Sequence, residues 1–157
     1  MTLSSANFYL PTACTCFRLR KVTRAMSRLY DQHLAAVGLK STQFVLLNFI
    51  ATEALPVAVL AERFGAERTT MTRNLKPLID AGWVSLEAGA DSRQRIVTIS
   101  SAGRRKAREA YQAWRAAQDA VQTLLGEAGL AELHRQIDHT FDLLSTLHHE
   151  DTHAEPA

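Results

Sequence analysis

The sequence predicts a mainly α-helical fold that carries one small β-hairpin. Two short helical patterns meet at a turn around Gly65, which is typical of a helix-turn-helix. β-rich residues at 83–87 and 95–99 then flank a polar turn, as in a hairpin. Longer amphipathic patterns over 14–37 and 101–148 enclose this central unit. With 157 residues and 46% hydrophobic composition the chain can bury one core, so we expect a single domain.

The net charge of +2 conceals an uneven distribution along the chain. Residues 62–108 carry ten basic and five acidic groups, whereas residues 126–157 carry one basic and seven acidic groups. A basic centre and an acidic end fit a protein whose central segment binds a polyanion. Random scatter of charge is the alternative.

The chain has no sequence feature of a membrane or secreted protein. It contains no run of about 18 or more apolar residues, and its N-terminal residues lack the basic-then-apolar order of a signal peptide. Its two cysteines, Cys14 and Cys16, are too few for a disulfide framework, which agrees with a reducing compartment. We therefore expect a cytoplasmic protein without a membrane partner.

The first helix is expected from about Cys14 to Val37, after an irregular arm at 1–12. Apolar residues recur at helical spacing, and Gly38 ends the pattern. A solvated face is the ordinary interpretation of its basic side, and contact with a second subunit or an effector is the alternative. This side carries Arg18, Arg20, Lys21, Arg24 and Arg28.

The second helix is expected from Ser41 to about Glu53. The hydroxyl of Ser41 or Thr42 can accept a hydrogen bond from a free amide at its start. Apolar residues surround most of this helix, which implies burial. Pro56 then interrupts the chain.

Two short helices form the predicted helix-turn-helix. Val57–Phe64 ends at Gly65, which is well suited to a left-handed cap, and Arg68–Ile79 follows. The apolar face of the latter is expected to pack inward through Met71, Leu75, Leu78 and Ile79. Hydroxyls and cations on the opposite face can contact phosphates and base edges, as a DNA major groove requires. That face carries Thr69, Thr70, Thr72, Arg73 and Lys76.

The hairpin is expected to pair Trp83–Glu87 with Arg95–Ile99, and its tip contains Asp91 and Arg93. An arginine on a ribbon tip suits a narrow minor groove, and a nearby carboxylate can hold it in place. An exposed turn in which Asp91 caps its own backbone is the alternative. The position directly behind a helix-turn-helix favours the groove contact.

Two helices are expected to complete the chain. Ser100 can cap the first, over Ser101–Leu125, and Gly126 and Gly129 separate it from the last, over about Leu130–His148. The small central unit cannot cover the apolar stripes of both helices. This predicts a homodimer in which they pack across a two-fold axis.

Three segments resemble the MarR family of winged helix-turn-helix transcription regulators: the run 68–75, the tip 91–93 and the ending 97–103. The match spans about residues 14–148. Together with the residue pattern, the resemblance implies a DNA-binding set of Arg68, Thr69, Thr70, Thr72, Arg73, Asn74, Lys76, Asp91, Arg93 and Arg95.

The resemblance also implies a winged helix-turn-helix lobe at 41–100 between dimerisation helices at 14–37 and 101–148. The implied target is palindromic double-stranded DNA, usually for repression. Release would follow binding of a small, often aromatic effector between the dimer helices and the lobe. Because such a slot needs apolar and aromatic walls, its candidate residues are Tyr30, Phe44 and Leu47.

Two residues depart from the family pattern. Glu67 stands where relatives often have Ser or Asp as the helix cap. Pro77 lies inside the recognition helix, where it removes an amide donor and is expected to bend the helix. Both departures concern the start and axis of the helix more than its role.

The cysteines suggest an alternative switch. The run 16–19 resembles the start of the first helix in the organic-peroxide-sensing branch of the family, where a cysteine is the sensor. That branch also supplies tyrosines that hold the thiolate, and residues 42–44 contain none. Redox sensing by Cys14 or Cys16 is one alternative, and a buried structural thiol is another. If both residues lie in regular helix, their side chains point about 200° apart and a bond between them is strained.

No metal site, cofactor or enzyme activity is expected. His148, His149 and His153 lie with acidic residues in a segment typical of a solvated tail. The sequence has no Gly-rich phosphate loop, metal-ligand spacing or nucleophile-base arrangement. A DNA-binding regulator is the main hypothesis, and a dimeric winged-helix adaptor that binds protein is the second.

Overall fold

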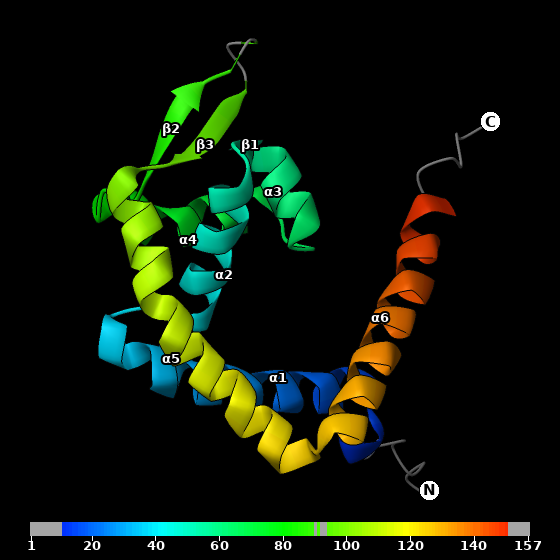
Figure 1. The fold of residues 1–157 in the computed structure, drawn as a ribbon. Coiled ribbons are helices and arrows are strands. Elements are labelled where there is room, and N and C mark those ends of the chain that lie inside the picture. Colours follow the sequence, from blue (N-terminus) through cyan, green and yellow to red (C-terminus); the bar gives the residue numbers. More distant parts are fainter. Residues whose placement is uncertain (1–10, 90, 92–93, 151–157) are drawn as a thin grey trace, which may run out of the picture. The chain divides into compact units, whose positions relative to one another are not determined.

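The structure is a computed structural model that describes residues 11–89, 91 and 94–150 (Figure 1). Of the expected N-terminal arm, residues 1–10 lie outside the described residues, and Pro11–Ala13 form a 3-10 turn, η1. The chain forms two compact units, residues 1–115 and residues 116–157. The first unit contains the predicted helix-turn-helix and hairpin.

Helix α1 spans Thr15–Leu34 and continues into a 3-10 turn, η2, at Ala35–Val37. Gly38 ends it as predicted, with φ at 69°. At this left-handed residue the chain changes direction, and the amide of Leu39 donates to the carbonyl of Leu34 at 3.2 Å. In Figure 1, α1 lies at the end of the first unit opposite the hairpin.

Helix α2 spans Ser41–Thr52, and its start differs from the prediction. The N-cap residue is Lys40, so Ser41 is already helical. Ser41 accepts no amide here; its own amide and hydroxyl both donate to Oδ1 of Asp31, each at 2.7 Å. The amide of Lys40 donates to Oε1 of Gln43 at 2.8 Å. The amides of Lys40 and Ser41 are thus satisfied by Gln43 and Asp31, and not by a hydroxyl of Ser41 or Thr42.

The sheet has three antiparallel strands in the order β1-β3-β2. The predicted hairpin is present as β2, Val84–Ala88, and β3, Arg95–Ile99, with β2 one residue later than expected. Strand β1, Leu55–Pro56, was not predicted; it pairs with β3 opposite Ile96 and Val97. Because Pro56 lacks an amide donor, a proline at this position fits the edge of the sheet.

The helix-turn-helix consists of α3, Val57–Arg63, and α4, Arg68–Asp80. Gly65 adopts the predicted left-handed conformation with φ at 57°, and the amide of Ala66 donates to the carbonyl of Ala61 at 2.9 Å. Pro77 lies inside α4, which continues beyond it as one helix to Asp80.

The core gathers around α2, α3, α4 and the sheet. The inward packing predicted for α4 is confirmed, because Met71, Leu75 and Leu78 are at most 1% exposed. Ile79 is partly buried against the same cluster. The largest fully buried side chains are Leu34, Leu46, Leu47, Ile50, Leu60, Met71, Leu75, Leu78 and Val97.

Helix α5 spans Ser101–Leu125 and begins directly after the sheet. The hydroxyl oxygen of Ser100 accepts the amide of Gly103 at 3.0 Å, as the predicted cap requires. The same hydroxyl donates to the carbonyl of Gly82 at 2.7 Å. Ser100 therefore fastens the start of α5 to the turn between α4 and β2.

Helix α6 spans Glu127–Glu150, so it begins earlier than predicted. Gly126 takes the left-handed conformation with φ at 71°, whereas Gly129 lies within the helix. One left-handed glycine is enough to separate two helices, and Gly129 does not interrupt α6. The exposed apolar side chains of α6 include Ile137, Phe141, Leu143 and Leu144.

Among the described residues, no single helix has the length and apolarity needed to cross a membrane. The segments Thr15–Val37 and Ser41–Thr52 reach that hydropathy only as a pair, which is bent by 73°.

Candidate nucleic-acid interface

The outward face of α4 carries the hydroxyls and cations that the sequence placed there. Arg68, Thr69, Thr72, Arg73 and Lys76 are all exposed, above the buried apolar face of the same helix. Long cationic side chains can reach phosphates and base edges, and a rigid apolar base fixes the direction of the helix. The surface has the chemistry of a major-groove reader.

Two members of the predicted set are less accessible. Thr70 and Asn74 are half-buried at the edges of the same face. The hydroxyl of exposed Thr72 donates to the carbonyl of Arg68 at 2.9 Å, one turn earlier in the helix. Its proton is therefore committed to the backbone, and Thr72 is left chiefly as a hydrogen-bond acceptor.

Lys76 is paired with an acidic neighbour in the absence of DNA. Its Nζ lies 2.9 Å from Oδ2 of Asp80, and both side chains are well exposed. An exposed pair at this spacing is weak and screened by salt. A phosphate can therefore compete with Asp80 for Lys76, although Asp80 lowers the positive potential at this end of α4.

The start of α4 has no side-chain cap. Glu67 occupies the N-cap position with extended backbone, and its carboxylate makes no capping hydrogen bond. The departure noted at Glu67 therefore leaves the first amides of α4 without a capping side chain. Amides at a helix N-terminus attract anions, whereas the carboxylate of Glu67 repels them.

The wing is formed by β2 and β3, and it projects from the first unit in Figure 1. Arg95, at the start of β3, is exposed and pairs in register with Ala88. Asp91 is also exposed, and its carbonyl accepts the amide of Gln94 at 2.8 Å. Arg93, the predicted minor-groove residue, lies outside the described residues.

The predicted effector residues are packed to different extents. Leu47 is fully buried and Phe44 is 5% exposed, with its ring stacked on Trp114 at a centroid distance of 5.7 Å. Tyr30 is half-buried, and this burial raises the pKa of its hydroxyl above the ordinary value. A ligand between Phe44 and Leu47 would have to displace core side chains.

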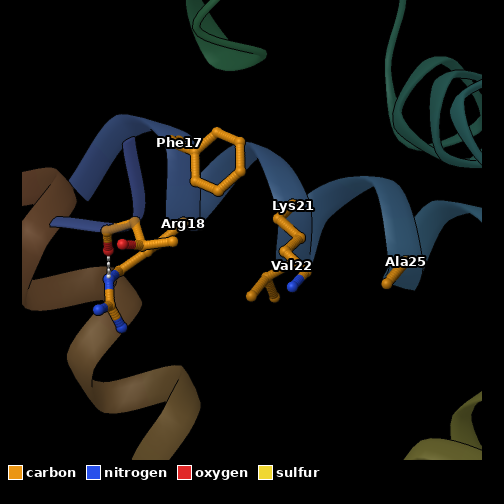
Figure 2. A pocket seen from close by; sticks show the side chains of 6 residues that line it. Phe17, Arg18, Lys21, Val22 and Ala25 are labelled. Atoms are coloured by element: carbon orange, nitrogen blue, oxygen red, sulfur yellow. Dashed lines mark hydrogen bonds between the residues drawn. The ribbon is translucent and has the colours of Figure 1, made fainter. Parts of the chain in front are cut away.

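An open hollow lies instead along the first half of α1. Its volume is about 460 Å³, and Figure 2 shows Phe17, Val22 and Ala25 at its wall. Nε of Arg18, also at the wall, donates to the carbonyl of Thr12 at 2.7 Å. The sequence offered effector contact as an alternative for the basic side of α1, and Arg18 and Lys21 of that side line the hollow. Its apolar wall was not expected, because the apolar residues of α1 resembled an ordinary packing stripe.

The two cysteines do not share one helical geometry. Cys14 is the N-cap of α1 with extended backbone, φ −74° and ψ 119°, whereas Cys16 lies in the first turn. Cys14 is half-buried, Cys16 is exposed, and both thiols are free. The angle of about 200° assumed regular helix at both positions, and that condition is not met. Of the candidate metal residues, His153 lies outside the described residues, as do the side chains of His148 and His149.

Comparisons with known proteins agree with this arrangement. A family model described as the MarR family matches residues 37–94. A crystal structure of the M. tuberculosis transcriptional regulator MosR in complex with DNA is 32% identical, with a TM-score of 0.78, and the match covers 85% of this chain and 98% of that one. A second MosR structure is 31% identical with a TM-score of 0.75, covering 87% and 99%.

A more distant match shares the fold. A mutant of MarR from E. coli complexed with operator DNA is 19% identical, with a TM-score of 0.75, and the match covers 85% of this chain and 99% of that one. A search of curated proteins found no match. MosR is matched above 30% identity over nearly its whole length, and the family model covers the helix-turn-helix and β2. This chain therefore belongs to the MarR family of winged helix-turn-helix transcription regulators.

Proposed function

We propose that the chain is a homodimeric repressor that binds palindromic double-stranded DNA and is released from it by a small effector. The observation that carries the proposal is the exposed face of α4, with Arg68, Arg73 and Lys76 above a fully buried apolar side. In this arrangement α4 enters the major groove, while Arg93 and Arg95 of the wing contact the adjacent minor groove. The MosR relative that was crystallised with DNA supports the same assignment.

Dimer formation is supported by apolar side chains that each unit leaves open. On α1, Phe17, Leu19 and Val22 are about half exposed, and on α6 Phe141 is 60% exposed. Exposed apolar side chains of this kind favour association, and a two-fold dimer is the commonest form. We assign the segments 14–37 and 101–148 to this dimerisation and 41–100 to DNA binding.

The DNA contact is tested by replacing Arg73 with alanine. We expect Arg73→Ala to weaken operator binding by about 1 to 3 kcal/mol and to relax preference at one base position in each half-site. Arg115→Ala, which removes an exposed arginine from α5, is the matched control and is expected to bind normally. Binding curves on systematically varied operators give both quantities. Equal losses in the two variants would show that only total charge matters.

The effector is proposed to be a small apolar or aromatic molecule. Tyr30, Phe44 and Leu47 stay the candidates from sequence, and the hollow beside Phe17 and Val22 is a second position. Its volume of about 460 Å³ lies in the usual range for ligand pockets, about 300 to 1,000 Å³. Compounds that release DNA can be retested on Ala25→Trp, which fills the hollow and leaves the exposed apolar residues named for dimerisation unchanged. Loss of release would assign the effector to α1, and unchanged release would return it to the Tyr30 region.

A second candidate for the switch is cysteine oxidation, because Cys14 lies outside regular helix and Cys16 is exposed. An organic hydroperoxide would oxidise two thiols to a disulfide and be reduced to an alcohol and water. The DNA-release assay is repeated with a hydroperoxide on Cys14→Ser, Cys16→Ser and the double variant. Release of the unmodified protein but not of Cys16→Ser would establish Cys16 as the sensor. Release of neither would leave the ligand switch.

A further inference from the structure

Trp83 lies where α4, the wing and α5 meet. Its amide donates to the carbonyl of Leu78 in α4 at 2.9 Å, and its carbonyl accepts the amide of Ser100, just before α5, at 2.9 Å. The next residue, Val84, begins β2. We call Trp83 and Ser100 the wing root, because their hydrogen bonds relate the wing to both α4 and α5.

Lys106 of α5 holds the side chain of Trp83. Its Nζ lies 5.4 Å from the centroid of the Trp83 ring, inside the limit of about 6 Å for a cation–π interaction. The same Nζ is 3.2 Å from Oε2 of Glu109, one turn further along α5. The Lys106 side chain is only 18% exposed, so its stem is packed and its charged end has little freedom. Tryptophan is the strongest aromatic partner for a cation, and partial burial strengthens the contact.

We propose that Lys106 is a positioning residue for DNA binding, which fixes the wing relative to α4 by way of Trp83. This inference rests on the proposed function, in which α4 and the wing contact adjacent grooves. A contact through two elements is tight only when both are already held in the right orientation, because ordering a loose element on binding costs free energy. Lys106 acts through Trp83 and not by touching DNA.

The start of α5 is a firm support for this contact. Nη1 of Arg104 donates to the carbonyl of Ala51 in α2 at 2.8 Å, which fixes α5 to the lobe independently of Lys106. At Gly103, α5 passes so close to the carbonyl of Trp83 that no Cβ would fit. Removing the charge of Lys106 should therefore loosen the wing root without detaching α5.

The first measurement is hydrogen exchange of the DNA-free protein, followed by NMR. Lys106→Met removes the charge and keeps a long apolar stem. The amides of Trp83 and Ser100 are expected to exchange about fivefold faster in this variant, since losing one partly buried cation–π contact favours local opening. Lys106→Arg, which returns a cation to the ring, is expected to restore the exchange rates of the unmodified protein.

Arg105→Met is the matched control. Arg105 is the neighbour of Lys106 in α5 and is exposed, and it forms no hydrogen bond or ion pair with any described residue. This variant loses the same charge from the same turn. It is expected to leave exchange at Trp83 and Ser100 unchanged.

The second measurement is binding to the duplex that the unmodified protein selects from a random-sequence pool. Lys106→Met is expected to weaken this binding about fivefold, whereas Lys106→Arg and Arg105→Met are expected to bind normally. Because the loss arises at the wing, Lys106→Met should cost less when Arg95→Ala has already removed a wing contact. A purely structural role would give equal losses with and without Arg95→Ala.

The inference is overturned if Lys106→Met and Arg105→Met behave alike in either measurement, or if Lys106→Arg does not restore both. Equal losses with and without Arg95→Ala would overturn it as well. Circular dichroism verifies that each variant is folded. An unmodified protein that binds no duplex would refute the proposed function and this role together, whereas normal binding by Lys106→Met would refute this role alone.

Discussion

Replacing Gly103 by alanine tests how tightly the start of α5 is joined to the wing. Gly103 is the third residue of α5, and its amide donates to the hydroxyl of Ser100 at 3.0 Å. A Cβ atom at this position would overlap the carbonyl oxygen of Trp83 and lie 2.8 Å from Cγ1 of Ile99. The carbonyl of Trp83 cannot move aside freely, because it accepts the amide of Ser100 at 2.9 Å.

The expected magnitude is a balance of two effects. Overpacking costs about 1 to 3 kcal/mol, and we take the upper value because the obstructing atom belongs to the backbone. Alanine in a helix gains at most about 1 kcal/mol over glycine. We therefore expect Gly103→Ala to lower the free energy of unfolding by about 2 kcal/mol. For a chain of this size, that corresponds to a fall in Tm of about 4 to 8 °C.

Urea unfolding followed by far-UV circular dichroism measures this change. The matched control is Gly129→Ala, because Gly129 is the third residue of α6 and a Cβ there would meet its nearest contact, Leu125 Cβ, at 3.8 Å. Without a clash, this variant is expected to gain up to about 1 kcal/mol. The reasoning is refuted if Gly103→Ala is as stable as the unmodified protein while Gly129→Ala behaves as expected.

Three further predictions concern the cap of α2 and the DNA surface. Asp31→Ala should lower the free energy of unfolding by about 1 to 2 kcal/mol, because Ser41 loses the acceptor of its amide. The control is Asp119→Ala, at an exposed site, which should change the free energy of unfolding by less than about 0.5 kcal/mol. Asp80→Asn should tighten operator binding several-fold by freeing Lys76 and removing a negative charge, and the gain should shrink when Lys76→Ala is added. If each protomer neutralises about four phosphates, log affinity should fall against log salt with a slope of about −7, on half-sites separated by about 10 base pairs. A flat response to salt would favour the protein-binding adaptor instead.

The residues of the candidate DNA surface were predictable because they follow a local rule. In a helix, the direction of each side chain is set by its position in the sequence, so the burial of Met71 and Leu75 places Arg73 and Lys76 outside. The turns at Gly38 and Gly65 were equally local, because glycine adopts the left-handed conformation at low cost. The same rule could not reveal the contact between Lys76 and Asp80, which depends on the rotamers of both side chains.

Strand β1 and the cap of α2 could not be predicted from nearby residues. The pairing of Leu55 with Val97 needs β3 to be folded first, and two residues carry too little pattern to indicate a strand. Likewise, Asp31 satisfies the amide of Ser41 only because the chain bends at Gly38 and brings the start of α2 next to α1. In both cases the partner becomes available only when distant segments pack together.

Composition alone could not show how closely the predicted effector residues are packed. Aromatic and apolar residues suit both a ligand slot and a core, and the sequence cannot tell which neighbours will cover them. Packing placed Phe44 against Trp114 and buried Leu47. A small hollow lined in part by Arg104 and Arg108 could not be predicted from composition either. It forms where the end of α2 meets the start of α5, and the two residues of the hydrogen bond there, Ala51 and Arg104, are 53 residues apart in the chain. Periodicity and glycine chemistry specify single elements, whereas pockets and long-range hydrogen bonds exist only where separate elements meet.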